Sequence, residues 1–313
     1  MPSVARFPFK RALGELREEY ELLTGDSCPP KQSILLKGDT AGSWRGPCRY
    51  VNVMGGLLSD GSFGSKTVFV DEDRGRLAGD VLHYLPNGEL IYSLPSKLVT
   101  PLRCGMMVAL ALSYRNLERE RDVLIVGSGE IGVATAAVLW ALRGELNIGS
   151  MSVKTGRRTT LNRDRLPVGV DQTPYIGRAD DSTTLVTATS HNGPPLEMGD
   201  LIAVPEEAVS LDSGLLLGKS WRQHAFSFCD HTLQMSKVLD AEFPHDGDTL
   251  NDPYVFQRRT QPLDKLAELR PGVCSAAYLY GIAIADLVIG RIIHEHLEEA
   301  KEFNTFADRM LYA

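Results

Sequence analysis

Residues 122–141 read DVLIVGSGEIGVATAAVLWA, an apolar segment that runs through a glycine-rich turn into a second apolar segment. The run at 122–126 predicts a strand of a parallel sheet that is covered on both faces. Gly127, Gly129 and Gly132 follow it in the spacing G-x-G-x-x-G, directly before a helical pattern, which is the context in which this motif binds a dinucleotide. The stretch therefore predicts a Rossmann-type domain.

Each glycine of this turn has a physical role in that prediction. Gly127 permits the tight turn, Gly129 lets the backbone approach a pyrophosphate, and Gly132 lets helix and strand pack closely. The amides and the positive dipole end of the helix would bind the phosphates. A plain glycine-rich connection is the alternative interpretation. We expect the coenzyme to contact Gly127, Ser128, Gly129, Glu130 and Ile131.

The next predicted strand, Ser152–Thr155, ends without an acidic residue. An acid at that point would bind the ribose 2′-hydroxyl of NAD and repel a 2′-phosphate. Thr155, Arg157 and Arg158 could instead bind the phosphate. We therefore expect NADP(H) to be preferred and NAD(H) to be the second choice, unless the two arginines only form the solvated end of a loop.

Strand and helix patterns alternate from about residue 120 to 240, which predicts a parallel sheet. Residues 49–99 instead hold strand patterns around the turn Pro86-Asn87-Gly88, which predicts an antiparallel hairpin. Long helices are expected at 7–23 and 273–302. The predicted fold class is α/β: a Rossmann-type parallel-sheet dinucleotide-binding domain plus a mixed α+β domain.

The composition excludes several classes of protein. Among 313 residues, 33 Lys and Arg face 40 Asp and Glu, and this acidic balance argues against a nucleic-acid partner. The five cysteines form no CxxC pair, which favours a reducing compartment. His224, Cys229 and His231 lack a fourth ligand, so no metal is expected. Without a signal peptide or a membrane-length apolar run, we expect a cytoplasmic protein.

Four motifs follow one another in this chain: VTPLRCGMMVALA at 99–111, the glycine-rich turn, VTATS at 186–190 and GIAIADL at 281–287. Their order resembles the ornithine cyclodeaminase/mu-crystallin family. Upstream, Gly64-Ser65-Lys66 is similar to the G-x-K motif of that family, and the resemblance spans roughly residues 45–295. The substrate side departs more from the family pattern than the coenzyme side does, so an unusual substrate is expected.

The resemblance implies two domains and a reaction. A Rossmann domain would occupy 117–273, and a substrate-binding and dimerisation domain would combine 1–116 with 274–313, in a homodimer. Hydride would move between a nicotinamide coenzyme and the α-carbon of a small α-amino, α-keto or imino acid, as in an imine reductase or amino-acid dehydrogenase. The alternatives are a cyclodeaminase that recycles its NAD and releases ammonia, and a coenzyme-binding protein with little catalysis.

The resemblance also assigns site residues. Lys66 and Arg103, completed by Arg45 or Arg49, are similar to the clamp that holds the substrate carboxylate. Asp212 falls about where the family has an aspartate that contacts the substrate nitrogen, so Lys66 and Asp212 are the catalytic candidates. A solvated edge lysine and a loop or capping aspartate are the alternatives for these two residues. At the end of the third predicted strand, the coenzyme would contact Thr187, Ala188 and Thr189.

Arg103 and Asp286 can also be interpreted without the resemblance. Thr100-Pro101 has the features of a helix start, an N-cap hydroxyl followed by proline. Arg103 would then lie in the first turn, where a cation is disfavoured unless an anion is bound there or the side chain turns outward. Asp286 lies among apolar residues of a predicted helix and therefore needs a partner.

Overall fold

The computed structural model describes residues 7–23, 27–37, 49–71, 76–154, 166–173, 183–189, 195–201, 204–211, 216–232, 234–235 and 259–300. The chain divides into two compact units. The first unit combines Met1–Arg103 with Gly281–Leu311, and the second unit is Cys104–Tyr280. No helix in the described residues is long and apolar enough to cross a membrane.

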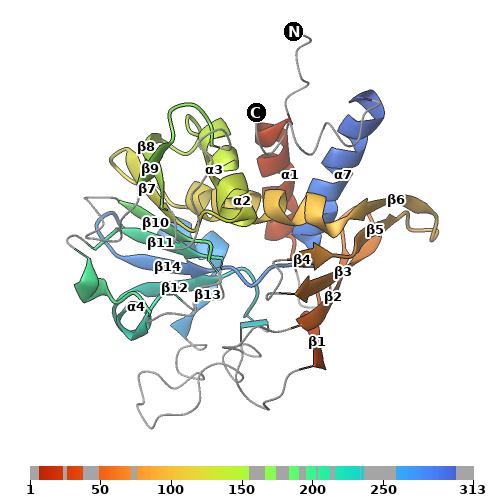
Figure 1. Cartoon of the computed structure of the whole chain (residues 1–313), viewed down its shortest axis with the longest axis horizontal. Helices are drawn as coiled ribbons and strands as arrows, with labels where there is room; N and C mark the ends of the chain where they lie inside the picture. Colours follow the sequence, from red (N-terminus) through yellow and green to blue (C-terminus); the bar gives the residue numbers. More distant parts are fainter. Residues whose placement is uncertain are drawn as a thin grey trace. The chain divides into compact units, whose positions relative to one another are not determined.

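The first unit is built on an antiparallel sheet with strand order β1-β2-β3-β5-β6, in which β4 also pairs with β3 (Figure 1). The predicted hairpin is confirmed, because β5 and β6 are antiparallel neighbours on either side of Pro86-Asn87-Gly88. The strands are β1 (Gln32–Lys37), β2 (Arg49–Leu57), β3 (Phe63–Asp71), β4 (Arg76–Ala78), β5 (Asp80–Tyr84) and β6 (Leu90–Pro95).

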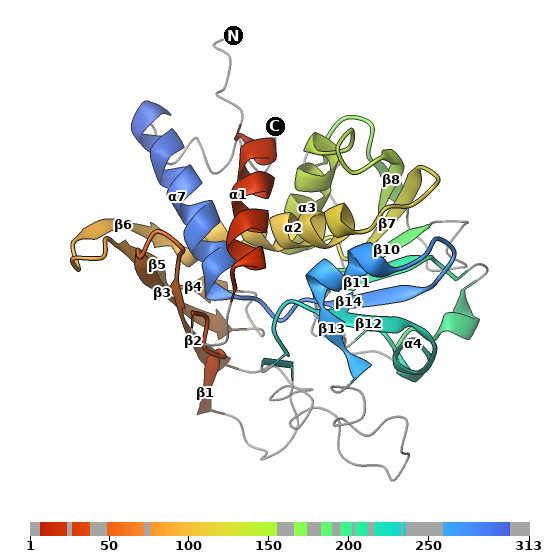
Figure 2. The same ribbon diagram turned by 180° about the vertical axis from the view of Figure 1, so that it is seen from behind.

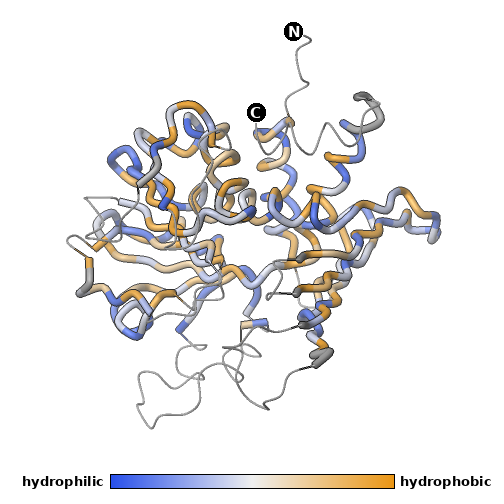
Figure 3. The backbone as a smooth tube through the Cα atoms, in the orientation of Figure 1, coloured by the Kyte–Doolittle hydropathy of each residue, from blue (hydrophilic) through white to orange (hydrophobic). Residues whose placement is uncertain are grey.

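Two helices, α1 (Phe9–Glu21) and α7 (Ala283–Ala300), lie side by side in the first unit, and α7 packs against the sheet (Figure 2). Helix α1 is amphipathic and buries Leu13, Leu16 and Tyr20, whereas residues 283–290 of α7 are all buried; Figure 3 shows hydrophobic and hydrophilic residues along both helices. The helix predicted at 7–23 is therefore confirmed.

Two glycines bring α7 close to the sheet. Gly56 of β2 and Gly64 of β3 are directly opposite each other in the register. A Cβ on Gly56 would lie 3.3 Å from Ala283, and a Cβ on Gly64 would overlap Leu287. Larger residues would push the N-terminal turns of the helix away from the two central strands.

The second unit holds a parallel sheet with strand order β13-β12-β14-β11-β10-β7-β8-β9. The order reverses between β7 and β10, as in Rossmann folds, which confirms the predicted fold class. Hydrophobic residues dominate the central strands in Figure 3. The strands are β7 (Arg121–Val126), β8 (Ile148–Lys154), β9 (Asp171–Thr173), β10 (Thr184–Thr187), β11 (Glu207–Ser210), β12 (Phe226–Cys229), β13 (Gln261–Pro262) and β14 (Ser275–Tyr278).

The helix expected to start at Thr100 begins earlier. Helix α2 is Ser96–Tyr114, with Pro101 inside it. Ser96 is fixed by the sheet, because its amide donates to the Gly79 carbonyl at 2.7 Å and its Oγ to the Thr67 carbonyl at 3.0 Å. The N-cap prediction was therefore wrong, and Arg103 lies about two turns into the helix rather than in the first turn.

The long helix expected at 273–302 is two elements. Residues 275–278 form β14, whose four residues are buried between β11 and β12. Only Ala283–Ala300 is helical. Gly281 lies between the two elements at φ +87°, a left-handed conformation that the strand-to-helix turn requires. The alanines suggested a helix, but parallel pairing with both neighbouring strands decides for a strand.

The remaining helices of the described residues belong to the second unit: α3 (Glu130–Ala141) and α4 (Lys219–His224), with short 3₁₀ turns at Met198–Asp200 and Leu263–Glu268. Helix α3 packs against α2, where a Cβ on Gly105 would lie 2.8 Å from Val138. This packing and the pairing of β14 place the second half of α2 and residues 274–280 in the second unit.

Candidate active site

The glycine-rich turn lies where the strand order reverses. Gly127 follows β7 at φ +130°, and a Cβ there would overlap the backbone of Ala188, which follows β10. The Ala188 amide donates to the Val126 carbonyl at 2.8 Å. Ligands of open parallel sheets bind at the carboxyl ends of the strands, at such a reversal. Because only glycine fits at position 127, the first glycine of the motif is what allows the turn to lie at this reversal of the strand order.

The N-terminus of α3 is open on the side of Gly129. This residue caps the helix without a side-chain hydrogen bond, and a Cβ built on it meets no atom within 4 Å. A Cβ on Gly132 would instead overlap the Gly127 carbonyl. The glycines therefore divide their roles: Gly127 and Gly132 allow close packing, while Gly129 leaves room for a group that approaches the helix amides. A pyrophosphate fits this arrangement.

The other expected coenzyme contacts are partly described. Thr187 is the buried last residue of β10, and Ala188 and Thr189 continue from it toward the turn at Gly127. Thr155, Arg157 and Arg158 lie outside the described residues, so their contact with a 2′-phosphate stays a prediction. Strand β8 ends at Lys154.

In the first unit, two cations of the expected clamp, Lys66 and Arg103, contact the buried carboxylate of Asp286. Lys66 Nζ is 2.6 Å from Asp286 Oδ1, and Arg103 Nε is 3.4 Å from the same oxygen. Lys66 and Asp286 are 1% and 0% exposed. Lys66 lies in a central strand, which rules out a solvated edge lysine. Arg103 pairs with a buried acid, which rules out an arginine turned to the surface.

Gly281 forms one wall of this cluster. A Cβ on this residue would lie 2.8 Å from Nη1 and 3.2 Å from Cζ of Arg103. The guanidinium therefore packs closely against a backbone that carries no side chain. Gly281 and Asp286 come from the same GIAIADL motif, so this one segment supplies both the space for Arg103 and its counter-ion.

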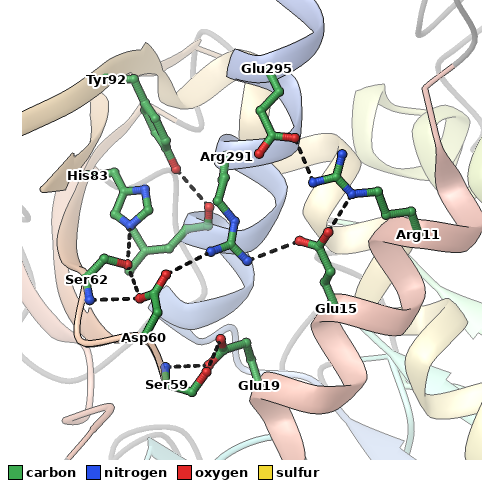
Figure 4. A network of polar contacts seen from close by, with 11 residues as sticks. Arg11, Glu15, Glu19, Ser59, Asp60, Ser62, His83, Tyr92, Arg291 and Glu295 are labelled. Carbon is green, nitrogen blue, oxygen red and sulfur yellow. Dashed lines mark hydrogen bonds and ion pairs between the residues drawn. The ribbon is translucent and has the colours of Figure 1, made fainter. Parts of the chain in front are cut away.

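Helix α7, which carries Asp286, is tied to its surroundings by polar contacts (Figure 4). Tyr92 of β6 donates to the Leu287 carbonyl at 2.8 Å. Arg291 is 3.3 Å from Asp60 in the β2–β3 turn and 3.1 Å from Glu15 of α1. Because Leu287 follows Asp286 directly, these contacts fix the height of the carboxylate above the sheet.

A chain of short hydrogen bonds continues from this turn into the sheet (Figure 4). Ser62 Oγ lies 2.6 Å from Asp60 and 2.9 Å from His83 Nε2. Burial opposes ionisation of Asp60, but the two hydrogen bonds from Ser62 hold the pKa of this carboxyl below its usual value. Burial, together with the charge of Arg291, lowers the pKa of His83 to about 4. At neutral pH the network therefore holds Asp60 charged and His83 neutral.

The structure does not describe the other predicted residues of the substrate site. Arg45 and Asp212 lie outside the described residues, as does the side chain of Arg49. In the part of the chain that the structure describes, no group of three His, Cys, Asp or Glu side chains gathers as metal ligands would. The residue that sequence reasoning undervalued is Asp286: its position among apolar residues signalled a partner but not which one.

No model of a known protein family matches the sequence, and no curated protein is detectably similar to it. Solved structures do match. Δ(1)-pyrroline-2-carboxylate reductase from Thermococcus litoralis, in complex with NADH and L-proline, is 16% identical with a TM-score of 0.72, covering 95% of both chains.

Two further structures represent other reactions. An archaeal alanine dehydrogenase, a dimer with bound NAD, is 17% identical with a TM-score of 0.69, covering 94% of this chain and 93% of that one. A lysine cyclodeaminase is 18% identical with a TM-score of 0.67, covering 96% and 90%. The fold implied by the resemblance is thus confirmed: the chain has the fold of the ornithine cyclodeaminase/mu-crystallin family.

Proposed function

We propose that this protein is an NAD(P)H-dependent oxidoreductase acting at the α-carbon of a small amino or imino acid. The observation that carries the proposal is the pair of cations, Lys66 and Arg103, held on one buried carboxylate in a chain whose second unit has an open dinucleotide turn at Gly129. The three structures compared above act on or bind α-amino acids according to their names.

The chain's residues have separate tasks in this reaction. In the proposed two-domain organisation, the Rossmann domain binds the coenzyme and the antiparallel domain binds the substrate. Lys66 and Arg103 hold the carboxylate, completed by Arg45 or Arg49, which fixes the α-carbon in one orientation. A bound nicotinamide coenzyme would supply the hydride for that carbon, and Asp212 would donate the proton that the nitrogen gains. The product is the amino acid, and the reverse reaction is its oxidation.

The test is a coenzyme assay with imino acids formed from α-keto acids and ammonia or methylamine, and with cyclic imino acids. We expect a steady loss of nicotinamide absorbance that Lys66→Met abolishes. Lysine cyclodeaminase supports a second candidate: release of ammonia from a diamino acid without net coenzyme change would establish it. Coenzyme binding without turnover of either kind would leave only a binding protein.

NADP(H) is the coenzyme we propose, because no acid follows β8 and Thr155, Arg157 and Arg158 can bind a phosphate. Of the three structures compared above, the two whose names include a coenzyme hold NADH or NAD. The proposed preference for NADP(H) therefore distinguishes this chain from those two proteins. Titration of nicotinamide fluorescence should give a lower Kd for NADPH than for NADH. In Arg157→Glu, the preference should reverse, because the new carboxylate repels the 2′-phosphate.

We further propose a homodimer formed by the open face of the first unit's sheet. The strands place four apolar side chains in one row across this face, since each is directly opposite the next in the register. Leu57 and Leu90 are 46% and 50% exposed, and Phe63 stacks on Tyr84 at 5.4 Å. Such a patch marks an association surface, and the archaeal alanine dehydrogenase is a dimer. The row consists of Leu57, Phe63, Tyr84 and Leu90.

Light scattering on wild type and Phe63→Glu tests the dimer. A two-fold contact brings the same patch of both copies together, so one substitution introduces two buried charges. We expect a dimeric wild type and a monomeric variant; a dimeric variant would assign the interface elsewhere. We place the protein in the cytoplasm, because its five cysteines form no CxxC pair, which favours a reducing compartment.

A further inference from the structure

We propose that Asp286 is the positioning residue of the carboxylate clamp: it holds Lys66 and Arg103 at one point and offsets one of their two positive charges. This inference rests on the proposed function and adds a residue to it. Asp286 itself does not touch the substrate in this proposal.

The geometry carries the first step. One oxygen of Asp286, Oδ1, accepts from Lys66 at 2.6 Å and lies 3.4 Å from Arg103 Nε. The other oxygen, Oδ2, is buried and accepts no hydrogen bond from the described residues. Asp286 therefore brings two cations, from different elements, to a single atom.

The charges carry the second step. Lys66 is 1% exposed, and a buried ammonium without a counter-ion loses its proton readily. Arg103 repels it, whereas Asp286 attracts it. His83, on the same face of the neighbouring strand β5, is neutral at pH 7 because burial lowers its pKa to about 4. The Asp286 carboxylate thus offsets one of these two positive charges, and the remaining charge attracts the carboxylate of a simple amino acid.

Close packing carries the third step. Gly64 lies two residues before Lys66 on the same face of β3, and it lets Leu287 of α7 approach the strand. Gly281 makes room for the guanidinium of Arg103. Tyr92 holds the Leu287 carbonyl. Each of these contacts lies beside Lys66, Arg103 or Asp286. The packing therefore fixes the distance between Asp286 and its two cations.

The test compares Asp286→Asn with Glu207→Gln. Glu207 is a matched control because it also makes a buried 2.6 Å pair, with Arg121, at the amino ends of the parallel strands. Steady-state kinetics use the acid identified by the coenzyme assay. We expect Asp286→Asn to raise KM for that acid about tenfold or more, with a smaller change in kcat and an unchanged Kd for the coenzyme. Glu207→Gln should leave KM unchanged.

A second readout does not depend on activity. The ¹³Cε signal of Lys66, assigned by its loss in Lys66→Met, reports when this lysine titrates. In Asp286→Asn it should titrate at a lower pH than in wild type, and in Glu207→Gln at the wild-type pH. If Asp286→Asn does not fold, Asp286→Glu replaces it: the longer side chain keeps the negative charge but displaces the two cations, so KM should rise while the Lys66 signal titrates near the wild-type pH.

The outcomes separate the two proposals. An unchanged Lys66 titration in Asp286→Asn would overturn the positioning role whatever the wild-type activity. If the wild type is active, an unchanged KM would overturn it as well. In the replacement variant, an unchanged KM would do the same. A shifted titration in a protein that turns over no amino or imino acid would overturn the proposed function and support the charge-holding role of Asp286.

Discussion

At the scale of single residues, glycines define the candidate site more sharply than charged residues do. Gly127 and Gly281 adopt φ values of +130° and +87°, and each faces an atom group that a Cβ would strike. Gly129 differs, because a Cβ built on it meets no described atom within 4 Å. The fold does not require glycine here, so the missing side chain leaves space for a bound ligand.

Gly129→Val tests this distinction. A Cβ at this position meets no described atom within 4 Å, so the branched side chain would project into the space at the N-terminus of α3, where the pyrophosphate is expected. We expect coenzyme Kd to rise at least about tenfold, while the poorer N-cap residue lowers the free energy of unfolding by only about 1 kcal/mol. Fluorescence titration and urea unfolding measure the two effects. Wild-type affinity in this variant would contradict a coenzyme site at α3.

At the scale of elements, the packing of α7 against the sheet determines how the first unit is assembled. It lies over glycines of β2 and β3 at its start, and farther along it meets β6, where a Cβ on Gly290 would lie 2.5 Å from Tyr92 Oη. Burial raises the pKa of Tyr92 above its ordinary value, so its hydroxyl remains a donor to the Leu287 carbonyl. The contact of α7 with the sheet is therefore specified by small residues and by hydrogen bonds from Tyr92 of β6 and Lys66 of β3.

A double-mutant cycle tests this contact. Gly290→Ala alone should cost about 1–3 kcal/mol, because overpacking outweighs the better helix propensity of alanine. Tyr92→Phe alone should cost about 1 kcal/mol through the lost hydrogen bond. Removing the hydroxyl relieves part of the clash, so the double variant should be more stable than the sum of the two costs predicts. Urea unfolding measures all three, and strict additivity would show that the two residues are not coupled.

At the scale of the whole molecule, the buried network around His83 makes stability depend on pH. Its pKa is about 4 in the folded protein against an ordinary value of 6.5. Between these values the unfolded chain binds one more proton than the folded one at this residue, so stability falls as pH drops from 6.5 to 4. The loss from this residue approaches about 3 kcal/mol and ends below pH 4.

Urea midpoints at pH 7 and pH 4.5 measure this effect in wild type and in His83→Gln. The variant keeps a polar group near Ser62 but removes the titration, so its stability should fall less between the two pH values. Equal losses in the two proteins would assign the acid sensitivity to other groups. Phe63→Glu, the dimer variant, belongs to the same scale because its effect depends on a second copy of the chain.

How far the sequence predicts the structure depends on the range of the interactions. The strand, turn and helix at 122–141 and the hairpin at Pro86-Asn87-Gly88 follow from local patterns, and the structure confirms both. The start of α2 was misplaced because Ser96 is fixed by carbonyls of distant strands. Residues 275–278 looked helical because their two neighbouring strands lie far away in the sequence.

The sequence by itself determined the Rossmann-type sheet and the role of each glycine in the turn, because hydrophobic period and glycine spacing are local properties. Lys66 and Arg103 became candidates through the resemblance to a known family. Only the tertiary structure decided that Asp286 joins these two cations, although 220 residues separate it from Lys66. A buried carboxylate must be paired, but which cation reaches it depends on how closely α7 approaches β3. That distance is set by packing of distant segments, which local patterns do not contain.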